Sequence, residues 1–196
     1  MPNQPFIAYA VDCVLSGFLE LPEGVRLTDF LNETETIALT EVHATSLQDG
    51  RVVEAYNLEV DVEELCAVEA PPALSEVGRR IATRVARAEV ELDPYEALGH
   101  VHGPTSGDPL LALSRRKRMI PLTDVTLAFA VAGKQHIIDL DVLIINRELA
   151  RFVPAAKYVK SKIDEMGLAS PDTRAKDLTG AIIFGHENTR QRRARR

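Results

Sequence analysis

A short phrase that occurs twice constrains this chain more than any other feature of its sequence. The segment IALTEV occupies residues 37–42, and IPLTDV occupies residues 120–125, which is 83 positions later. Four of the six letters are identical, and the fifth letter exchanges Glu41 for Asp124. Self-similarity at a fixed period is typical of a repeated structural unit. The phrase therefore suggests that one small β unit occurs twice in the chain.

The flanks of the two phrases preserve the same order of landmarks. Gly50 and Gly133 follow the phrases at the same offset of 83, and each copy then reaches a proline, Pro71 or Pro154. The second copy has a few extra residues near LDPYEALG, which indicates a lengthened hairpin. These matches favour duplication, and the alternative is one larger β sandwich without repeat symmetry.

Short apolar runs separated by turn residues indicate strands. IAYAVDCVLSGFLEL is interpreted as a first strand, and Asp49-Gly50 predicts a two-residue hairpin turn with positive φ at both positions. The run IIDLDVLII at 137–145 alternates poorly, so a strand buried on both faces is expected. Each unit of about 70 residues with five short strands matches a small closed or nearly closed barrel. Small domains bury little surface, so two packed units would share a core.

The predicted fold class is mainly β, with two tandem small β-barrel repeats followed by a C-terminal helix and a flexible tail. The first repeat covers residues 1–72, and the second covers residues 78–156. The remaining residues, 157–196, contain the predicted helix in AAKYVKSKIDEMGLAS, a short apolar strand AIIFG at 181–185, and a basic tail. The AIIFG strand is expected to dock on a barrel edge, either its own or that of another copy.

The segment RLTDFLN at 26–32, followed by IALTEV, resembles the motif of an uncharacterised bacterial domain family, R-L-S/T-D-x-L-N and a short strand. The resemblance covers most of both units and implies a small Sm-like or SH3-like barrel. The second copy departs from the motif, because LLALSRRKRMIPLTDV keeps PLTDV but lacks the aspartate and the asparagine. The resemblance implies a fold, and it carries no activity to this chain.

The RLTDFLN motif also has a physical interpretation from its residues alone. Thr28 or Asp29 could cap a short helical turn, and Asn32 could hold the exit turn. The functional alternative is a ligand rim made of Arg26, Asp29 and Asn32.

Charge is distributed unevenly along the chain. The net charge is −6, yet residues 1–189 carry −11 because the last seven residues hold five arginines. An acidic body argues against nucleic-acid binding through a basic face of that body. The residues that could contact an anion or a nucleic acid are Arg115, Arg116, Lys117 and Arg118 of SRRKR, and Arg190, Arg192, Arg193, Arg195 and Arg196 of the tail. SRRKR could equally face anionic lipid or an acidic edge, such as DVEE at 61–64, on another copy.

The motifs and residue clusters that could carry catalysis do not indicate an enzyme. His100 and His102 share a strand face and could hold a metal only with a third ligand, for which Asp108 or Asp93 is available. A surface strand with two histidines is the simpler interpretation. No G-x-S-x-G and no Walker or dinucleotide loop occurs, and no cofactor is expected. Cys13 and Cys66 are interpreted as free thiols of a reducing compartment.

The sequence thus predicts a non-catalytic, cytoplasmic binding or assembly module that uses strand edges and the C-terminal segment. A protein partner or self-association is expected. No apolar run reaches the length of about 18 residues that a spanning helix needs, and no signal peptide is expected. The alternative function is contact with RNA or DNA through SRRKR and the arginine tail, followed by a metal-dependent activity at His100 and His102.

Overall fold

The computed structural model describes residues 3–70 and 83–155, which form two successive sets of strands. The first set consists of β1 (Asn3–Ala10), β2 (Cys13–Glu20), α1 (Leu27–Glu33), β3 (Thr36–Ser46), β4 (Val52–Asp61), the 3-10 helix η1 (Val62–Glu64) and β5 (Leu65–Glu69). The second set consists of β6 (Arg84–Leu92), β7 (Tyr95–Gly103), the 3-10 helix η2 (Leu111–Arg115), β8 (Met119–Val131), β9 (Lys134–Asn146) and β10 (Arg151–Pro154). We call residues 3–70 the first half and residues 83–155 the second half.

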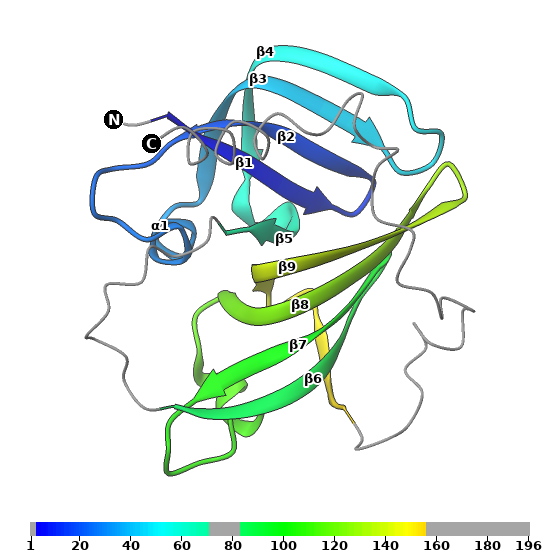
Figure 1. Cartoon of the computed structure of the whole chain (residues 1–196). Helices are drawn as coiled ribbons and strands as arrows, with labels where there is room; N and C mark the ends of the chain where they lie inside the picture. Colours follow the sequence, from blue (N-terminus) through cyan, green and yellow to red (C-terminus); the bar gives the residue numbers. More distant parts are fainter. Residues whose placement is uncertain (1–2, 71–82, 156–196) are drawn as a thin grey trace, which may run out of the picture.

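All ten strands belong to one antiparallel sheet with the order β10-β6-β7-β8-β9-β5-β1-β2-β3-β4. Each half contributes the same arrangement, because its last strand returns to pair with its first strand. β5 pairs with β1 in the first half, and β10 pairs with β6 in the second half. Figure 1 shows the first half above the second, with β5 and β9 meeting between them. The sheet is open, and β4 and β10 are its terminal strands.

The paired residues at this junction, 67–68 of β5 and 143–145 of β9, are buried on both faces. Consecutive residues of an extended strand point to opposite faces. Accordingly Ile144 of β9 packs into the core of the first half, whereas Leu143 and Ile145 pack into the core of the second half. β5 behaves in the same way, since Val68 belongs to the first core and Ala67 to the second. One pair of strands therefore supplies side chains to two cores.

The repeated hexapeptides form the same backbone irregularity. Glu41 and Asp124, the fifth residues of the two phrases, have positive φ angles of 51° and 50°. Each lies in a β-bulge, at which the strand pairing skips Gly17 in β2 or Gly99 in β7. A Cβ at Gly17 would lie 2.8 Å from the Thr40 carbonyl oxygen, and one at Gly99 would lie 2.9 Å from Val125 Cγ2. Bulges bend the strands that contain them, so this pairing of glycine and bulge curves each half similarly.

The mainly β class and the short helix at RLTDFLN are confirmed. The two halves are joined into one continuous open sheet, because β5 and β9 hydrogen-bond across the boundary. The burial of 137–145 on both faces holds for its last three residues, which are buried, whereas its first part is half-buried or exposed. Among the described residues, no helix is long and apolar enough to cross a membrane.

Two local predictions were wrong. IAYAVDCVLSGFLEL is not one strand, because the chain reverses between Ala10 and Cys13 and forms the β1–β2 hairpin. The turn after β3 is longer than two residues, and Gly50, with φ 71°, has positive φ there while Asp49 does not. Two consecutive positive φ angles occur instead at Ala132 and Gly133, between β8 and β9. The predicted C-terminal helix, AIIFG strand and arginine tail lie outside the described residues.

The bulge geometry predicts that the two glycines respond unequally to substitution. Gly17→Ala should lower the free energy of unfolding by about 1–3 kcal/mol, since the new methyl group meets a backbone carbonyl that cannot move aside. Gly99→Ala should cost less, because the closest atom is a side-chain methyl group. Gly107→Ala is the control, with nothing within 4 Å of the added Cβ. Urea unfolding measures all three, and equal stability of the Gly17 and Gly107 variants would contradict the geometry.

Candidate functional site

The RLTDFLN motif forms α1 at the boundary between the halves. Arg26 is the N-cap residue and makes no side-chain capping hydrogen bond, so capping by Thr28 or Asp29 was the wrong expectation. Arg26 and Asp29 are exposed, whereas Leu27 and Leu31 are buried in the core of the first half. The helix is therefore anchored by its leucines, and its first turn presents charged side chains to solvent.

Asn32 connects this helix to the second half. Its Nδ2 donates to the carbonyl oxygens of Thr28 and Met119, and its Oδ1 accepts from the Met119 N–H, all at 2.8 Å. The amide thus pairs with both backbone groups of Met119, the first residue of β8, as a neighbouring strand would. Of the three residues of the predicted ligand rim, Asn32 has its amide oxygen and nitrogen engaged in these bonds, whereas Arg26 and Asp29 are exposed.

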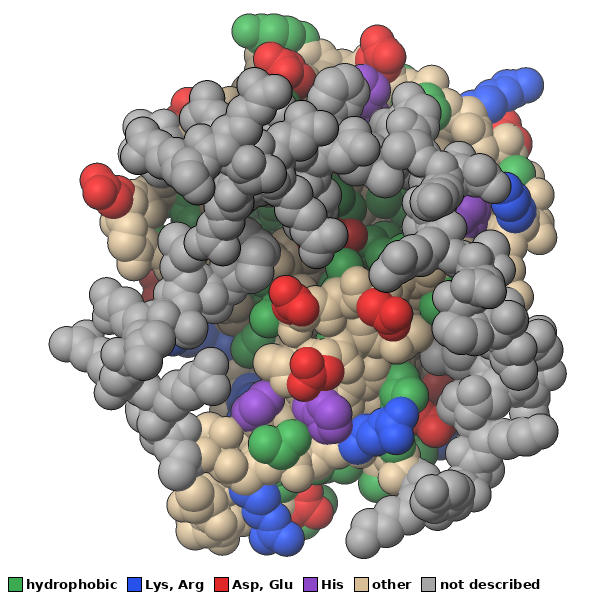
Figure 2. All heavy atoms as spheres, viewed as in Figure 1, with side chains coloured by type: hydrophobic (Ala, Val, Ile, Leu, Met, Phe, Trp, Pro, Cys, Tyr) green, Lys and Arg blue, Asp and Glu red, His purple; other side chains and the backbone are tan. Residues whose placement is uncertain are grey.

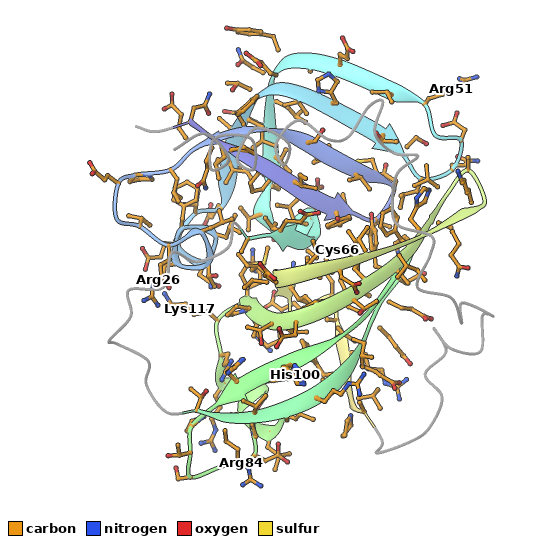
Figure 3. The ribbon with its side chains drawn as sticks, viewed as in Figure 1. Arg26, Arg51, Cys66, Arg84, His100 and Lys117 are labelled. Atoms are coloured by element: carbon orange, nitrogen blue, oxygen red, sulfur yellow. The ribbon has the colours of Figure 1, made fainter. Side chains whose placement is uncertain are left out.

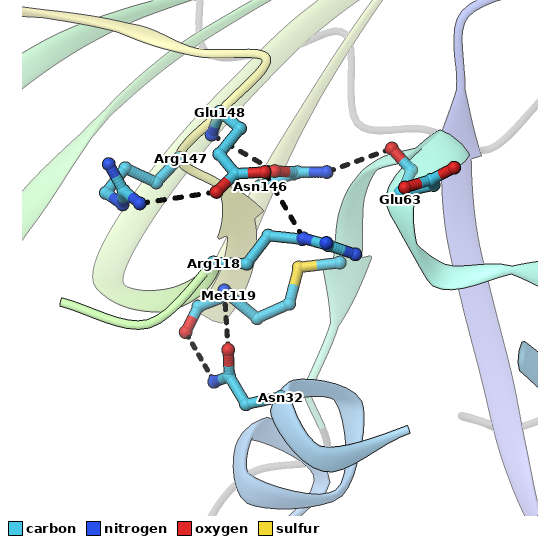
Figure 4. A network of polar contacts seen from close by, with 7 residues as sticks. All are labelled: Asn32, Glu63, Arg118, Met119, Asn146, Arg147 and Glu148. Carbon is cyan, nitrogen blue, oxygen red and sulfur yellow. Dashed lines mark hydrogen bonds and ion pairs between the residues drawn. The ribbon is translucent and has the colours of Figure 1, made fainter. Parts of the chain in front are cut away.

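Asn146 makes a second connection across the boundary. This residue is 1% exposed, its Nδ2 donates to the Glu63 carbonyl at 3.1 Å, and its Oδ1 accepts from the Glu148 N–H at 3.1 Å. Figure 4 shows the two asparagines on either side of Met119, which pairs with Asn146 in the β8–β9 ladder. Each asparagine satisfies backbone groups of the opposite half where the regular ladder ends. We call Asn32, Met119, Asn146 and Glu63 the polar seam.

The SRRKR cluster lies beside this seam and is largely engaged within the chain. Lys117 Nζ lies 3.4 Å from Glu33 Oε1 of α1, and Arg118 Nε lies 3.3 Å from Glu148 Oε2. Arg116 donates to the carbonyl oxygen of His102, and Arg115 ends η2. Figure 3 shows Lys117 at the same end of the molecule as Arg26. Of the residues expected to contact an anion, those at 190–196 lie outside the described residues.

The two histidines of β7 are committed to local contacts. His102 contacts Thr83 Oγ1 through Nδ1 at 3.1 Å and Thr123 Oγ1 through Nε2 at 2.8 Å. His100 Nδ1 lies 3.5 Å from the exposed carboxylate of Asp124. Figure 2 shows histidine and acidic side chains next to each other on this face. Within the described ranges, no group of three or more His, Cys, Asp and Glu residues could hold a metal ion.

The cysteines lie near a buried aromatic cluster between the halves. Tyr9, Tyr95 and Phe129 are in ring contact, and the Tyr95 hydroxyl donates to the Ala10 carbonyl at 2.6 Å. Burial raises the pKa of Cys13 to about 12, with a further contribution from Asp12. Burial likewise raises the pKa of Cys66 to about 11. Since the thiolate is the reactive form, both side chains suit packing rather than nucleophilic chemistry.

The terminal strands leave backbone available for pairing along one whole side in the described part of the chain. β4 has a strand partner on one side only, β3, and β10 likewise pairs only with β6. β4 also exposes apolar side chains, with Val53 66% and Tyr56 78% exposed. Unpaired N–H and C=O groups along a strand are a ready template for another strand. These two edges were not specified by the sequence, because strand order is not visible in a local pattern.

The polar seam predicts that Asn32 contributes to stability. Asn32→Ala should lower the free energy of unfolding by about 2–4 kcal/mol, since it leaves both backbone groups of Met119 without partners. Asn32→Asp removes the donor at equal size, and acid should restore part of the loss because a protonated carboxyl can donate to the Met119 oxygen. Asp29→Ala on the exposed face of α1 is the control. Chemical unfolding at neutral and acidic pH measures these variants, and no loss in Asn32→Ala would contradict the assignment.

Comparison with known proteins adds no relative. No family model matches the chain, and neither a curated protein nor a solved structure matches it.

Proposed function

We propose that this protein is a non-catalytic cytoplasmic module that assembles through the edges of its sheet. The observation that carries the proposal is the open ten-stranded sheet, whose two terminal strands have one unpaired side each among the described residues. The exposed Val53 and Tyr56 on β4 support the same interpretation, because large apolar side chains on an edge strand favour association.

The proposal includes an origin for the architecture. Two tandem small barrels, Sm-like or SH3-like, would explain why both halves have the same strand order and the same bulge opposite a glycine. In this proposal the repeats cover residues 1–72 and 78–156, and the segment 157–196 adds to the association. Fusion of the two sheets at β5 and β9 then gives one body whose terminal strands, β4 and β10, are left for partners.

The chemistry of the polar residues supports a non-catalytic role. Both ring nitrogens of His102 contact threonine hydroxyls, and the raised pKa values of the two thiols disfavour thiolate at neutral pH. Lys117 and Arg118 lie in ion pairs with acidic residues of the chain itself, so nucleic-acid contact would depend on the arginines at 190–196.

Light scattering after size exclusion tests the proposal on the full chain. The mass should exceed the 21.6 kDa of one chain and should fall on dilution. Glu59→Pro should lower the mass, because proline removes a donor and is tolerated only at a strand edge, whereas Glu59→Ala keeps the donor and should not lower the mass. Deletion of residues 177–196 should reduce the mass as well. A mass of 21.6 kDa at every concentration would contradict assembly, and retardation of single-stranded RNA that weakens steeply with salt would favour the nucleic-acid alternative.

A further inference from the structure

The junction between the halves is a template for an association between copies. β5 pairs with β9 in an antiparallel register. The opposed residues are Ala67 and Ile145, Val68 and Ile144, and Glu69 and Leu143. This is the pairing by which one half already adds its last strand to the edge of the other half.

The two strands that end the sheet are the counterparts of the two strands at the junction. β4 follows the bulged strand β3 as β9 follows the bulged strand β8, and β10 pairs with β6 as β5 pairs with β1. One terminal strand, β4, is thus equivalent to β9, and the other, β10, is equivalent to β5. β4 lacks a β5-like neighbour, and β10 lacks a β9-like neighbour, within the described ranges.

We propose that copies of this chain associate head to tail, with β10 of one molecule adding to β4 of the next. The inference rests on the proposed function and names its partner, which is a second copy of the same chain. Such a contact joins two different surfaces, so it is heterologous and leaves one edge free at each end. It closes into a ring or extends into a filament, depending on the rotation between copies.

The internal registers fix the register between copies. Next to the bulges, Thr40 opposes Asn57 in the first half, and Thr123 opposes Val142 in the second half. Asn57 of β4 is therefore equivalent to Val142 of β9. The next three residues of β4, 58–60, are then equivalent to residues 143–145 of β9. Counting from the hairpins, Arg151, Phe152 and Val153 of β10 correspond to Ala67, Val68 and Glu69 of β5. Val153 of one copy therefore opposes Leu58 of the next. Phe152 then opposes Glu59, and Arg151 opposes Val60.

The backbone groups of β10 are suited to this register with one exception. Ala70 N–H donates to the Val142 carbonyl at 3.2 Å, so alternate residues of β5, including Val68, direct their backbone groups toward β9. Phe152 takes the place of Val68 and can exchange two hydrogen bonds with Glu59. Pro154 takes the place of Ala70, and it supplies a carbonyl oxygen but no N–H. The association therefore has one hydrogen bond fewer than the internal junction.

Charge complements the backbone pairing. The counterpart of Asn146 is Asp61, and the loop after Asn146 is the counterpart of η1, which Asn146 contacts. The same arrangement between copies brings Asp61 next to the backbone of Arg147, whose side-chain Nε is buried and has no hydrogen-bond partner among the described residues. Glu148, in the same loop, is already paired with Arg118 and Arg147. Thus the acidic end of β4 in one copy lies near Arg147 of the next.

The helices next to the polar seam bring a second basic residue of one copy near acidic residues of the next. Asn32 of α1 contacts Met119 at the start of β8, and the counterpart of Met119 is Thr36 at the start of β3. The counterpart of α1 is η2, which ends at Arg115. Association between copies places Arg115 near Thr36, which follows the acidic residues Glu33 and Glu35. η2 contains no asparagine and ends in an arginine, which fits an acidic neighbour.

The side chains at the two junctions differ in polarity. The internal pairs Ala67–Ile145 and Val68–Ile144 are apolar, whereas their counterparts between copies each include a charged residue, Arg151 or Glu59. Charged side chains on edge strands limit uncontrolled pairing. We therefore expect association between copies to be reversible and weakened by salt, in contrast to the permanent internal junction.

A register-specific disulfide tests the inference. Leu58→Cys and Val153→Cys are placed in two separately tagged full-length chains, which are mixed and mildly oxidised. A mixed disulfide should form, because opposed residues of antiparallel strands lie close enough to bridge. The control mixes Glu59→Cys with Val153→Cys, since residue 59 points to the opposite face. Wild-type chains, with Cys13 and Cys66 alone, give the background.

The outcomes separate this inference from the proposed function. A disulfide in the Leu58→Cys mixture, and none in the Glu59→Cys mixture, supports the predicted register. Oligomers by light scattering without that disulfide would overturn the head-to-tail register and leave edge assembly standing. A disulfide that forms only after residues 177–196 are deleted would mean that the chain covers its own edge, and would overturn the inference for the full chain. A wild-type monomer at all concentrations would overturn both proposals.

Discussion

The backbone pairing of β5 with β9 is the interaction on which the rest of the structure depends. The paired residues 67–68 of β5 and 143–145 of β9 are buried on both faces, so the side chain of each belongs to one of two cores. Ile144 fills the first core while its neighbours Leu143 and Ile145 fill the second. A slip by one residue would exchange every side chain between the cores, so the register is strongly specified. The same pairing turns two small halves, each marginal by itself, into one body.

Polar contacts complete this junction where the ladder ends. The amides of Asn32 and Asn146 satisfy backbone groups of Met119 and Glu63 in the opposite half. Buried backbone groups without partners are costly, so the seam defines where the two halves can meet. The bulges at Glu41 and Asp124 act within each half, because they bend the strands that contain them. Curvature, register and seam together leave β4 and β10 as the ends of the sheet.

Local features of this structure were readable from the sequence, and the pairing between distant segments was not. The repeated phrase predicted that residues around Glu41 and Asp124 would be equivalent, and the structure places both in bulges with nearly equal φ. The motif RLTDFLN predicted a short helix, but its asparagine contacts Met119, which is 87 residues away. Nothing near Asn32 in the sequence indicates that partner. The glutamate at 41 likewise gives no signal for a left-handed conformation, which glycine and asparagine adopt more readily.

The proposed function follows from the contrast between polar groups that are engaged in contacts within the chain and strand edges that are not. Histidines, thiols and most of the SRRKR cluster are occupied by contacts within the chain, whereas two strand edges keep backbone groups without a strand partner among the described residues. Within the chain, the edge strand β5 of the first half already pairs with β9 of the second half, so the same backbone pairing is available between copies. An edge that carries charge and a proline suits association that is limited in strength.

Native-state hydrogen exchange tests the central role of the β5–β9 pair most directly. The amide protons of Val68 and Ile144 should exchange only through global unfolding, with the largest free energies of opening in the chain. The outward amide of Glu59 on β4 should exchange at a much lower free energy in dilute protein. If instead Val68 and Ile144 exchange through a partial opening, while the interior of each half stays protected, the halves are separable units and the β5–β9 pair does not hold the fold together.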